Sequence, residues 1–108
     1  MGTVRWDLAD YGKSRGSGAA TMVGTFINSG NTTSNAATAT NLDDGAAGAG
    51  SDVTAALGQV LHVTCTELAR LKFGGVAATA TAGFLLQPDI ARDFEITAAG
   101  TISVFDEA

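Results

Sequence analysis

Apolar and charged residues alternate at the start of the chain. Val4, Trp6 and Leu8 are apolar, whereas Arg5 and Asp7, which lie between them, are charged. A period of two residues is typical of a β-strand with one buried face and one solvated face. The pattern therefore predicts a strand that places Trp6 in the core and Arg5 on the surface.

A glycine-rich loop and further strand sequence complete the N-terminal part, residues 3–28. Residues 12–18 contain three glycines among polar neighbours, a composition that indicates a loop. Residues 21–28 carry apolar side chains on both alternating sets of positions, which favours a strand covered on both faces. This interpretation places Phe26 in the core.

Residues 29–52 cannot build a core of their own. Leu42 is the only large apolar side chain in these 24 positions. So long a loop in a small domain either lies against a partner or is disordered, and we expect a partner. The segment is therefore interpreted as an extended loop or arm. A calcium loop formed by Asp43, Asp44 and Asp52 is the less favoured alternative, because the spacing and the missing closing glutamate do not fit.

The second half of the chain contains a β-module, residues 59–105. Its sequence predicts five short strands separated by turn signals. They are expected at residues 59–66, 69–73, 79–86, 92–97 and 102–104. Short strands spaced by about ten residues are typical of sandwiches and barrels. We therefore expect a single all-β domain over residues 1–108, a small β-sandwich or jelly-roll-like barrel of seven or eight strands with long loops in its N-terminal half. The expected core residues are Trp6, Phe26, Leu61, Val63, Leu71, Phe73, Phe94, Ile96, Ile102 and Val104.

The composition makes this core poor in large side chains. Ala, Thr and Gly account for 48 of the 108 residues, and there is one cysteine. A small domain with such a core depends on disulfides, a metal or neighbouring molecules. One cysteine excludes an intrachain disulfide, and no cluster of metal-binding side chains indicates zinc. We therefore expect the chain to oligomerise.

The charge balance argues against nucleic acid as a partner. Six basic residues against 11 acidic ones give a formal net charge of −5, which repels a phosphate backbone. No apolar stretch approaches the roughly 20 residues of a membrane helix, and the start of the chain lacks the pattern of a secretion signal. The sequence predicts a protein that is made in the cytoplasm and binds neither nucleic acid nor a membrane.

Candidate catalytic groups do not combine into a site. His62 and Cys65 lie three positions apart on one predicted strand, so their side chains point to opposite faces and cannot form a nucleophilic dyad. Residues 12–14 (GKS) lack the preceding glycine of a phosphate-binding loop, since Asp7 occupies that position. A solvated or docking edge is expected from the carboxylates Asp93, Glu95, Asp106 and Glu107. We expect no catalytic residue, cofactor, metal or small-molecule substrate.

Five motifs follow one another in the second half of the chain. They are A-x-L-x-F-G-G at residues 69–75, a Thr/Ala-rich loop at 77–81, G-F-x-L-x-P at 83–88, an acidic alternation at 92–97 and G-T-I-S-V at 100–104. In this order they resemble the C-terminal β-module of small virion proteins of tailed phages. The families that carry it are chiefly head decoration (cement) proteins and head-fibre bases.

The resemblance, which covers residues 59–105, implies a non-enzymatic structural protein of the virion. Its expected role is capsid decoration, in which a homotrimer binds the major capsid protein on the capsid exterior and stabilises the phage head. A head-fibre or spike base, a connector or a tail component is the alternative within the same class. A free carbohydrate-binding or receptor-binding β-module is an alternative from another class.

Contacts with the capsid are expected in the two segments whose sequences cannot contribute to a self-contained core. The glycine-rich loop carries Lys13 and Arg15, which suit an acidic capsid surface. The arm carries Leu42 as its one apolar anchor, beside Asp43 and Asp44. The competing hypothesis is that both segments are solvated loops without a partner.

Overall fold

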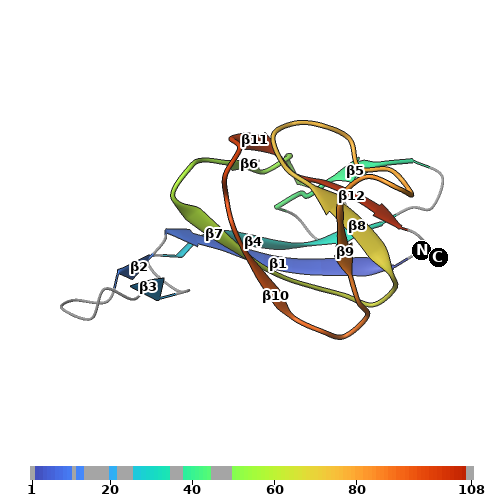
Figure 1. Ribbon diagram of the computed structural model, residues 1–108, viewed down its shortest axis with the longest axis horizontal. Coiled ribbons are helices and arrows are strands. Elements are labelled where there is room, and N and C mark those ends of the chain that lie inside the picture. The colour runs from blue at the N-terminus through green and yellow to red at the C-terminus, as the bar shows by residue number, and fades with distance from the viewer. Residues whose placement is uncertain are drawn as a thin grey trace.

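Two antiparallel sheets of four strands each face one another in the computed structural model of the protein (Figure 1). The structure describes residues 2–10, 12–13, 20–21, 26–34, 38–44 and 50–106. All regular structure in these residues is β, and the sheets form a small sandwich. The all-β prediction is therefore confirmed. The described part of the chain contains no helix able to cross a membrane.

The first sheet has the strand order β10-β7-β1-β4, and the second has the order β5-β12-β8-β9. The strands of the first sheet are β10 (Arg92–Glu95), β7 (Gln59–Cys65), β1 (Thr3–Asp10) and β4 (Phe26–Thr33). Those of the second are β5 (Thr40–Asn41), β12 (Ser103–Asp106), β8 (Ala69–Lys72) and β9 (Phe84–Leu86). Two short pairs complete the described structure: β6 (Thr54–Ala55) with β11 (Gly100–Thr101), and β2 (Gly12–Lys13) with β3 (Ala20–Thr21).

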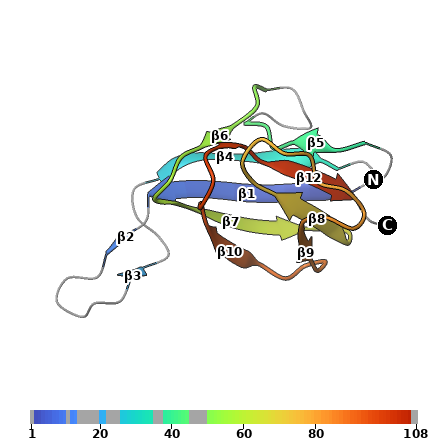
Figure 2. The same cartoon turned by 45° about the horizontal axis from the view of Figure 1, so that its top comes forward.

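The pair β2 and β3 projects beyond one end of the sandwich (Figure 2). Strand β1 leads into this projection and β4 returns from it, so the two long strands lie antiparallel. The two ends of the chain lie at the opposite end of the sandwich (Figure 1). There the amide of Ser34 donates a hydrogen bond of 2.8 Å to the carbonyl oxygen of Gly2.

Strands β1 and β7 form the centre of the first sheet. Trp6 is paired with Val63 and Leu8 with Leu61, and all four side chains are buried. Their neighbours along each strand point to the outer face, as the period of two predicts. The predicted strands at the start of the chain and at residues 59–66 are therefore confirmed.

One predicted core residue, Phe26, is exposed instead. Its side chain retains 62% of its accessible surface. The pairing of β1 with β4 shifts between Leu8 and Ala9, so that Leu8 is paired with Asn28 and Ala9 with Phe26. The extra residue, Ile27, reverses the inside-outside alternation, as a β-bulge does. Of the other nine predicted core residues, Phe73 packs against the core and the following belong to it: Trp6, Leu61, Val63, Leu71, Phe94, Ile96, Ile102 and Val104.

The predicted arm contributes to the fold more than its sequence indicates. Strand β4 continues to Thr33, and Thr32 is fully buried. Leu42 is also fully buried and belongs to the core cluster. Its amide donates a 2.8 Å hydrogen bond to the carbonyl oxygen of Ile102, which follows β11. Small side chains let this segment approach the sheets closely, so backbone hydrogen bonds hold it where apolar contacts are few.

Two further expectations need correction. Strand β9 is shorter than predicted, because Thr79 and Ala82 exchange backbone hydrogen bonds in a turn that occupies the start of the predicted strand. Asp106, expected on a solvated edge, is 1% exposed and accepts a 3.4 Å hydrogen bond from the Ser34 hydroxyl. The adjacent Glu107 lies outside the described residues.

Candidate functional site

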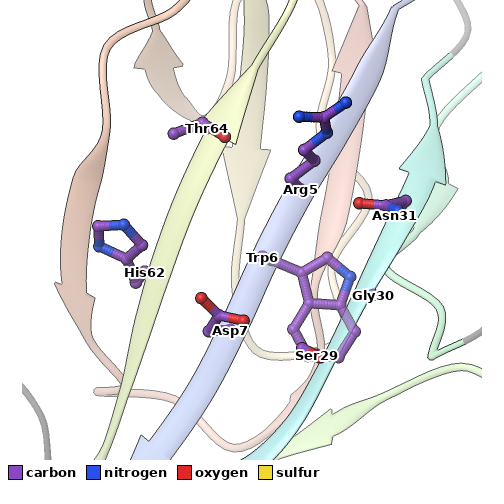
Figure 3. Close-up of a pocket in the computed structure, with 8 residues that line it drawn as sticks. All are labelled: Arg5, Trp6, Asp7, Ser29, Gly30, Asn31, His62 and Thr64. Atoms are coloured by element: carbon purple, nitrogen blue, oxygen red, sulfur yellow. The ribbon is translucent and has the colours of Figure 1, made fainter.

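A hollow of about 370 Å³ lies on the outer face of the first sheet (Figure 3). Strands β7, β1 and β4 supply its walls, and their outward side chains alternate with core residues. The polar side chains that line it are Arg5, Asp7, Ser29, Asn31, His62 and Thr64. The structure thus gathers donors and acceptors from three strands that are distant in sequence.

The strand register places these six side chains in two rows. Arg5 on β1 is paired with Thr64 on β7 and with Asn31 on β4. Side chains that are directly opposite on neighbouring strands lie about 5 Å apart at Cβ. The second row, one step along the strands, consists of His62, Asp7 and Ser29.

The second row extends to a fourth strand through a side-chain hydrogen bond. His62 on β7 is paired with Asp93 on β10, and the His62 Nδ1 lies 2.5 Å from the Asp93 Oδ1. Half of the His62 side-chain surface remains exposed. Because Nδ1 is occupied by the carboxylate, the ring is oriented and Nε2 is left for another partner.

Trp6 and Gly30 form the floor of the hollow, from β1 and β4 respectively. The Trp6 indole is packed into the core on the inner side of this floor. A Cβ on Gly30 would lie 3.1 Å from the indole ring and would collide with the backbone oxygen of Asp43. Glycine is thus required here, and close packing beneath the sheet makes the floor rigid.

Apolar rings cluster at the side of the sandwich where β9 and β10 are the edge strands. The ring centroids of Phe73 and Phe84 lie 5.9 Å apart, and those of Phe84 and Phe94 lie 5.1 Å apart. Phe84 is 52% exposed, and Ile90, in the connection from β9 to β10, is 56% exposed. We call the cluster of Phe73, Phe84 and Phe94 the aromatic edge. It is an apolar surface on an acidic protein.

Arg92 fixes the geometry of the aromatic edge. Its guanidinium lies 4.7 Å from the centroid of the Phe94 ring. Its Nη1 also donates a 2.8 Å hydrogen bond to the carbonyl oxygen of Leu85 on β9. The side chain therefore connects the edges of the two sheets, and a cation stacked on an aromatic ring adds to their attraction.

Of the two basic residues predicted to bind the capsid, only Lys13 belongs to the described residues, and it lies on neither the hollow nor the aromatic edge. Lys13 belongs to β2, in the projection beyond the end of the sandwich (Figure 1). Arg15 lies outside the described residues.

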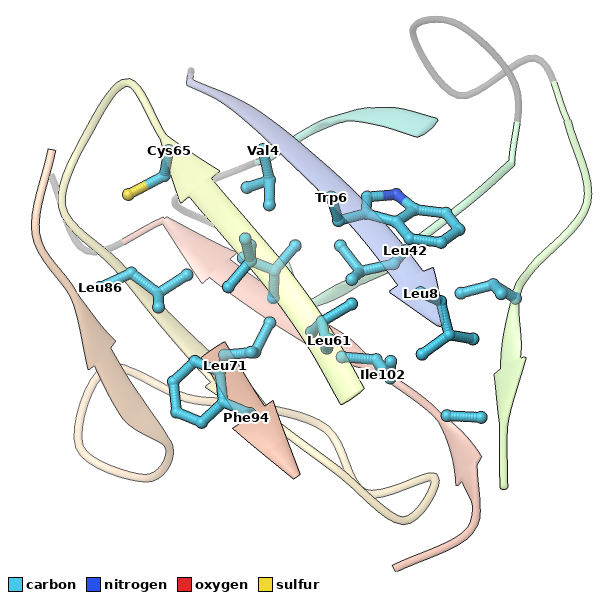
Figure 4. Packing of buried hydrophobic residues seen from close by; sticks show 14 of the residues in the cluster. Val4, Trp6, Leu8, Leu42, Leu61, Cys65, Leu71, Leu86, Phe94 and Ile102 are labelled. Atoms are coloured by element: carbon cyan, nitrogen blue, oxygen red, sulfur yellow. The ribbon is translucent and has the colours of Figure 1, made fainter. Parts of the chain in front are cut away.

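The three arm residues predicted to bind the capsid differ in exposure. Leu42 lies among core side chains such as Trp6 and Leu8 (Figure 4) and is fully buried, so it supports the fold and is not available to a partner. Asp43 is 6% exposed, and its Oδ1 accepts a hydrogen bond from the amide of Gly50. Asp44 is exposed, although its Oδ1 accepts a 2.8 Å bond from the Ser51 amide.

The calcium alternative gains no support from the described residues, which contain no group of three or more metal-binding side chains. Asp52, the third carboxylate of that alternative, accepts a 3.0 Å hydrogen bond from the Asn41 side chain. Asp43 and Asp52 face one another in an isolated backbone bridge. The carboxylates thus connect segments of the arm.

Cys65 is buried at the end of β7, on the face opposite to that of His62. Burial raises the pKa of its thiol, and the nearby carboxylates of Asp89 and Asp106 raise it further. The thiol donates a 3.4 Å hydrogen bond to the carbonyl oxygen of Gln87. A thiol with a raised pKa remains protonated at neutral pH and is a weak nucleophile.

Most residues of the hollow cannot be assigned from the sequence. Alternation predicts that Arg5 and Asp7 point outward, but it does not tell which strands flank them. Asn31 and Thr64 come from strands on either side, at sequence distances that no motif marks. The signal that would identify the hollow is the register of three strands, which requires the fold.

A scan of the chain against protein-family models and searches of curated proteins and of solved structures find no match. A function is therefore inferred from the surfaces described above and from the resemblance of residues 59–105.

Proposed function

We propose that the protein is a non-enzymatic structural component of a tailed-phage virion. In this role it is a capsid decoration protein, which binds the major capsid protein from outside as a homotrimer and stabilises the head shell. The observation that carries the proposal is the aromatic edge, where Phe84 is more than half exposed on a cluster of three rings. Exposed apolar groups backed by a rigid framework are typical of surfaces that bind other proteins.

The framework of the sandwich supports the same role. Residues 59–105, which resemble the virion module, supply β7 and β10 of the first sheet and β8, β9 and most of β12 in the second. The aromatic edge lies wholly within this module. A shell-binding protein needs such a stiff framework and an exposed docking surface, and it needs no reacting group.

Trimer formation is part of the proposal because the core contains few large side chains. Its largest fully buried side chains are leucines, isoleucines and valines, and Trp6 and Phe94 are the only aromatic residues in the described core cluster. The surplus of apolar burial over chain entropy is small in such a domain. Three copies on a local three-fold axis of a capsid lattice would each gain buried surface from two neighbours.

The test compares phage particles that carry the wild-type protein with particles assembled with the Phe84→Asp variant. Image reconstruction is expected to show trimeric density on the outside of the shell at every local three-fold position, and loss of that density in the variant. Leu57→Asp is the matched control, since Leu57 is 67% exposed but lies in the turn before β7. It is expected to leave the density unchanged.

Position and copy number decide between the alternatives. Density at only a few vertices or at the tail would indicate that the protein is a fibre base, a connector or a tail component and not a decoration protein. Absence of the protein from purified particles would overturn the virion assignment. Full occupancy by the Phe84→Asp protein would show that the aromatic edge is not the docking surface.

A further inference from the structure

We propose that the hollow on the outer face of the first sheet binds a small neutral sugar. The site is separate from the aromatic edge and adds a ligand-binding activity to the proposed structural role. It rests on the side chains of Arg5, Asp7, Asn31, His62 and their neighbours on three adjacent strands.

The chemistry of the walls suits a ligand rich in hydroxyl groups. Arg5 can only donate hydrogen bonds and ionised Asp7 can only accept them, whereas Ser29, Asn31 and Thr64 can do both. A carboxylate accepts hydrogen bonds from two adjacent hydroxyl groups, and a guanidinium donates two parallel bonds. Adjacent hydroxyl groups on a sugar ring can act as partners of both kinds, because each hydroxyl group both donates and accepts.

The polar groups of the hollow are free to bind. Within the described part of the chain, the side chains of Arg5, Asp7 and Asn31 form no hydrogen bond or ion pair. His62 has one partner, Asp93, which orients its ring and leaves Nε2 unoccupied. Sugar hydroxyl groups can therefore bind these side chains without displacing a protein partner, while ordering the exposed side chains of Arg5 and Asp7 costs conformational entropy.

The charge and polarity of the hollow argue against other ligand classes. The single cation, Arg5, is offset by Asp7 on the same strand, so neither a phosphate nor a cation is favoured. His62 and Asp93 likewise form an internal pair. The one apolar side chain of the lining, Trp6, is 3% exposed, which gives a lipid or an aromatic ligand little to contact.

The size of the hollow limits the ligand to one or two sugar rings. Its volume of about 370 Å³ lies near the lower end of the range of about 300 to 1,000 Å³ that small-molecule sites occupy. Because no exposed aromatic ring lines it, a sugar would bind through hydrogen bonds without stacking. We therefore expect millimolar affinity, which is within reach of NMR titration.

The test is an NMR titration of the isotope-labelled full chain with glucose, galactose, N-acetylglucosamine, maltose and lactose. At least one of these probes is expected to give saturable shifts confined to amides around the hollow. Asp7→Ala is expected to weaken that binding about tenfold or more, because it removes a charged acceptor. Asp7→Asn retains the shape of the side chain and should weaken binding in the same direction.

Glu95→Ala is the matched control. Glu95 is an exposed carboxylate on β10, on the same outer face but outside the hollow, and its removal should leave the affinity unchanged. The proposal is overturned if none of the five sugars gives saturable shifts around the hollow, or if Asp7→Ala binds as wild type. Tighter binding of glucose 6-phosphate than of glucose would contradict the proposal that the ligand is neutral. Capsid binding plays no part in this assay, so its outcome is independent of the proposed structural role.

Discussion

Strand β7 and the described residues of the arm, 29–34, 38–44 and 50–52, join the same core by different means. Strand β7 buries Leu61, Val63 and Cys65 on one face through an alternation that is visible in the sequence, although Val60 on the other face is buried as well. The arm buries only one large apolar residue, Leu42. A segment without an apolar pattern can thus be part of a small sandwich if the rest of the fold satisfies its polar groups.

Hydrogen bonds show how the arm is held. The Asp43 amide donates to the hydroxyl oxygen of buried Thr32 at 3.0 Å. The Val53 amide donates to the carbonyl oxygen of Leu42 at 2.9 Å. The Ser34 hydroxyl donates to the buried carboxylate of Asp106. Buried polar groups are tolerated when they are paired in this way, so the arm needs few apolar contacts.

The strongest test of the comparison is to truncate one leucine in each region. Leu42→Ala and Leu61→Ala are both expected to lower the free energy of unfolding by about 2 to 5 kcal/mol, since each removes a fully buried side chain. Urea denaturation of the two variants at equal protein concentration measures the loss. If Leu42 were a surface anchor for a partner, Leu42→Ala would change stability by only about 0.5 kcal/mol.

The sequence alone predicts the fold where burial follows a local pattern. Strands β1, β7, β8 and β10 are predicted because each alternates over at least four residues. The exposure of Phe26 is not predicted, because it depends on a bulge in the pairing of β4 with β1. The burial of Leu42 is not predicted either, because it depends on a backbone bond to Ile102, which is distant in sequence.

The hollow is less predictable than the fold for the same reason. The outward direction of Arg5 and Asp7 follows from alternation on one strand. The hydrogen bond of His62 with Asp93 joins residues that are 31 positions apart, and only the pairing of β7 with β10 brings them together. A site on the face of a sheet is defined by register, which a single sequence does not specify.

The second test concerns the contact between the arm and β1. Gly30→Ala is expected to cost about 1 to 3 kcal/mol, because the added methyl group overlaps the Asp43 backbone oxygen and presses on Trp6. The chain contains one tryptophan, so its fluorescence spectrum should change as well. Ser29→Ala, on the outer face one residue earlier, should stay within about 0.5 kcal/mol of wild type. Equal stability of the two variants would contradict the close packing of the arm on Trp6.

The third test removes one polar contact of the arm without changing its shape. Thr32→Val deletes the oxygen that accepts the Asp43 amide and should lower stability by about 1 kcal/mol. Hydrogen exchange of the Asp43 amide should become faster at the same time. Thr33→Val, at the next and less buried position, is the control and should alter neither quantity. Unchanged exchange in Thr32→Val would show that this bond does not hold the arm.

The smallest expected effect lies at the end of β7, where Cys65 is buried by the local alternation. Burial, with Asp89 and Asp106 nearby, raises the pKa of this thiol in the folded protein above its value in the unfolded chain. The unfolded chain therefore loses the thiol proton at a lower pH than the folded protein does. The contribution of Cys65 to stability is complete below the unfolded pKa and is lost as the pH rises through the folded value.

Unfolding free energies measured from neutral to alkaline pH, for wild type and Cys65→Ala, isolate this contribution because every other titrating group is shared. The wild-type curve is expected to fall more steeply than that of the variant on the alkaline side. Parallel curves would mean that the Cys65 thiolate is as stable in the folded protein as it is in water. The end of β7 would then be open to solvent, and the burial that alternation predicts for this strand would stop at Val63.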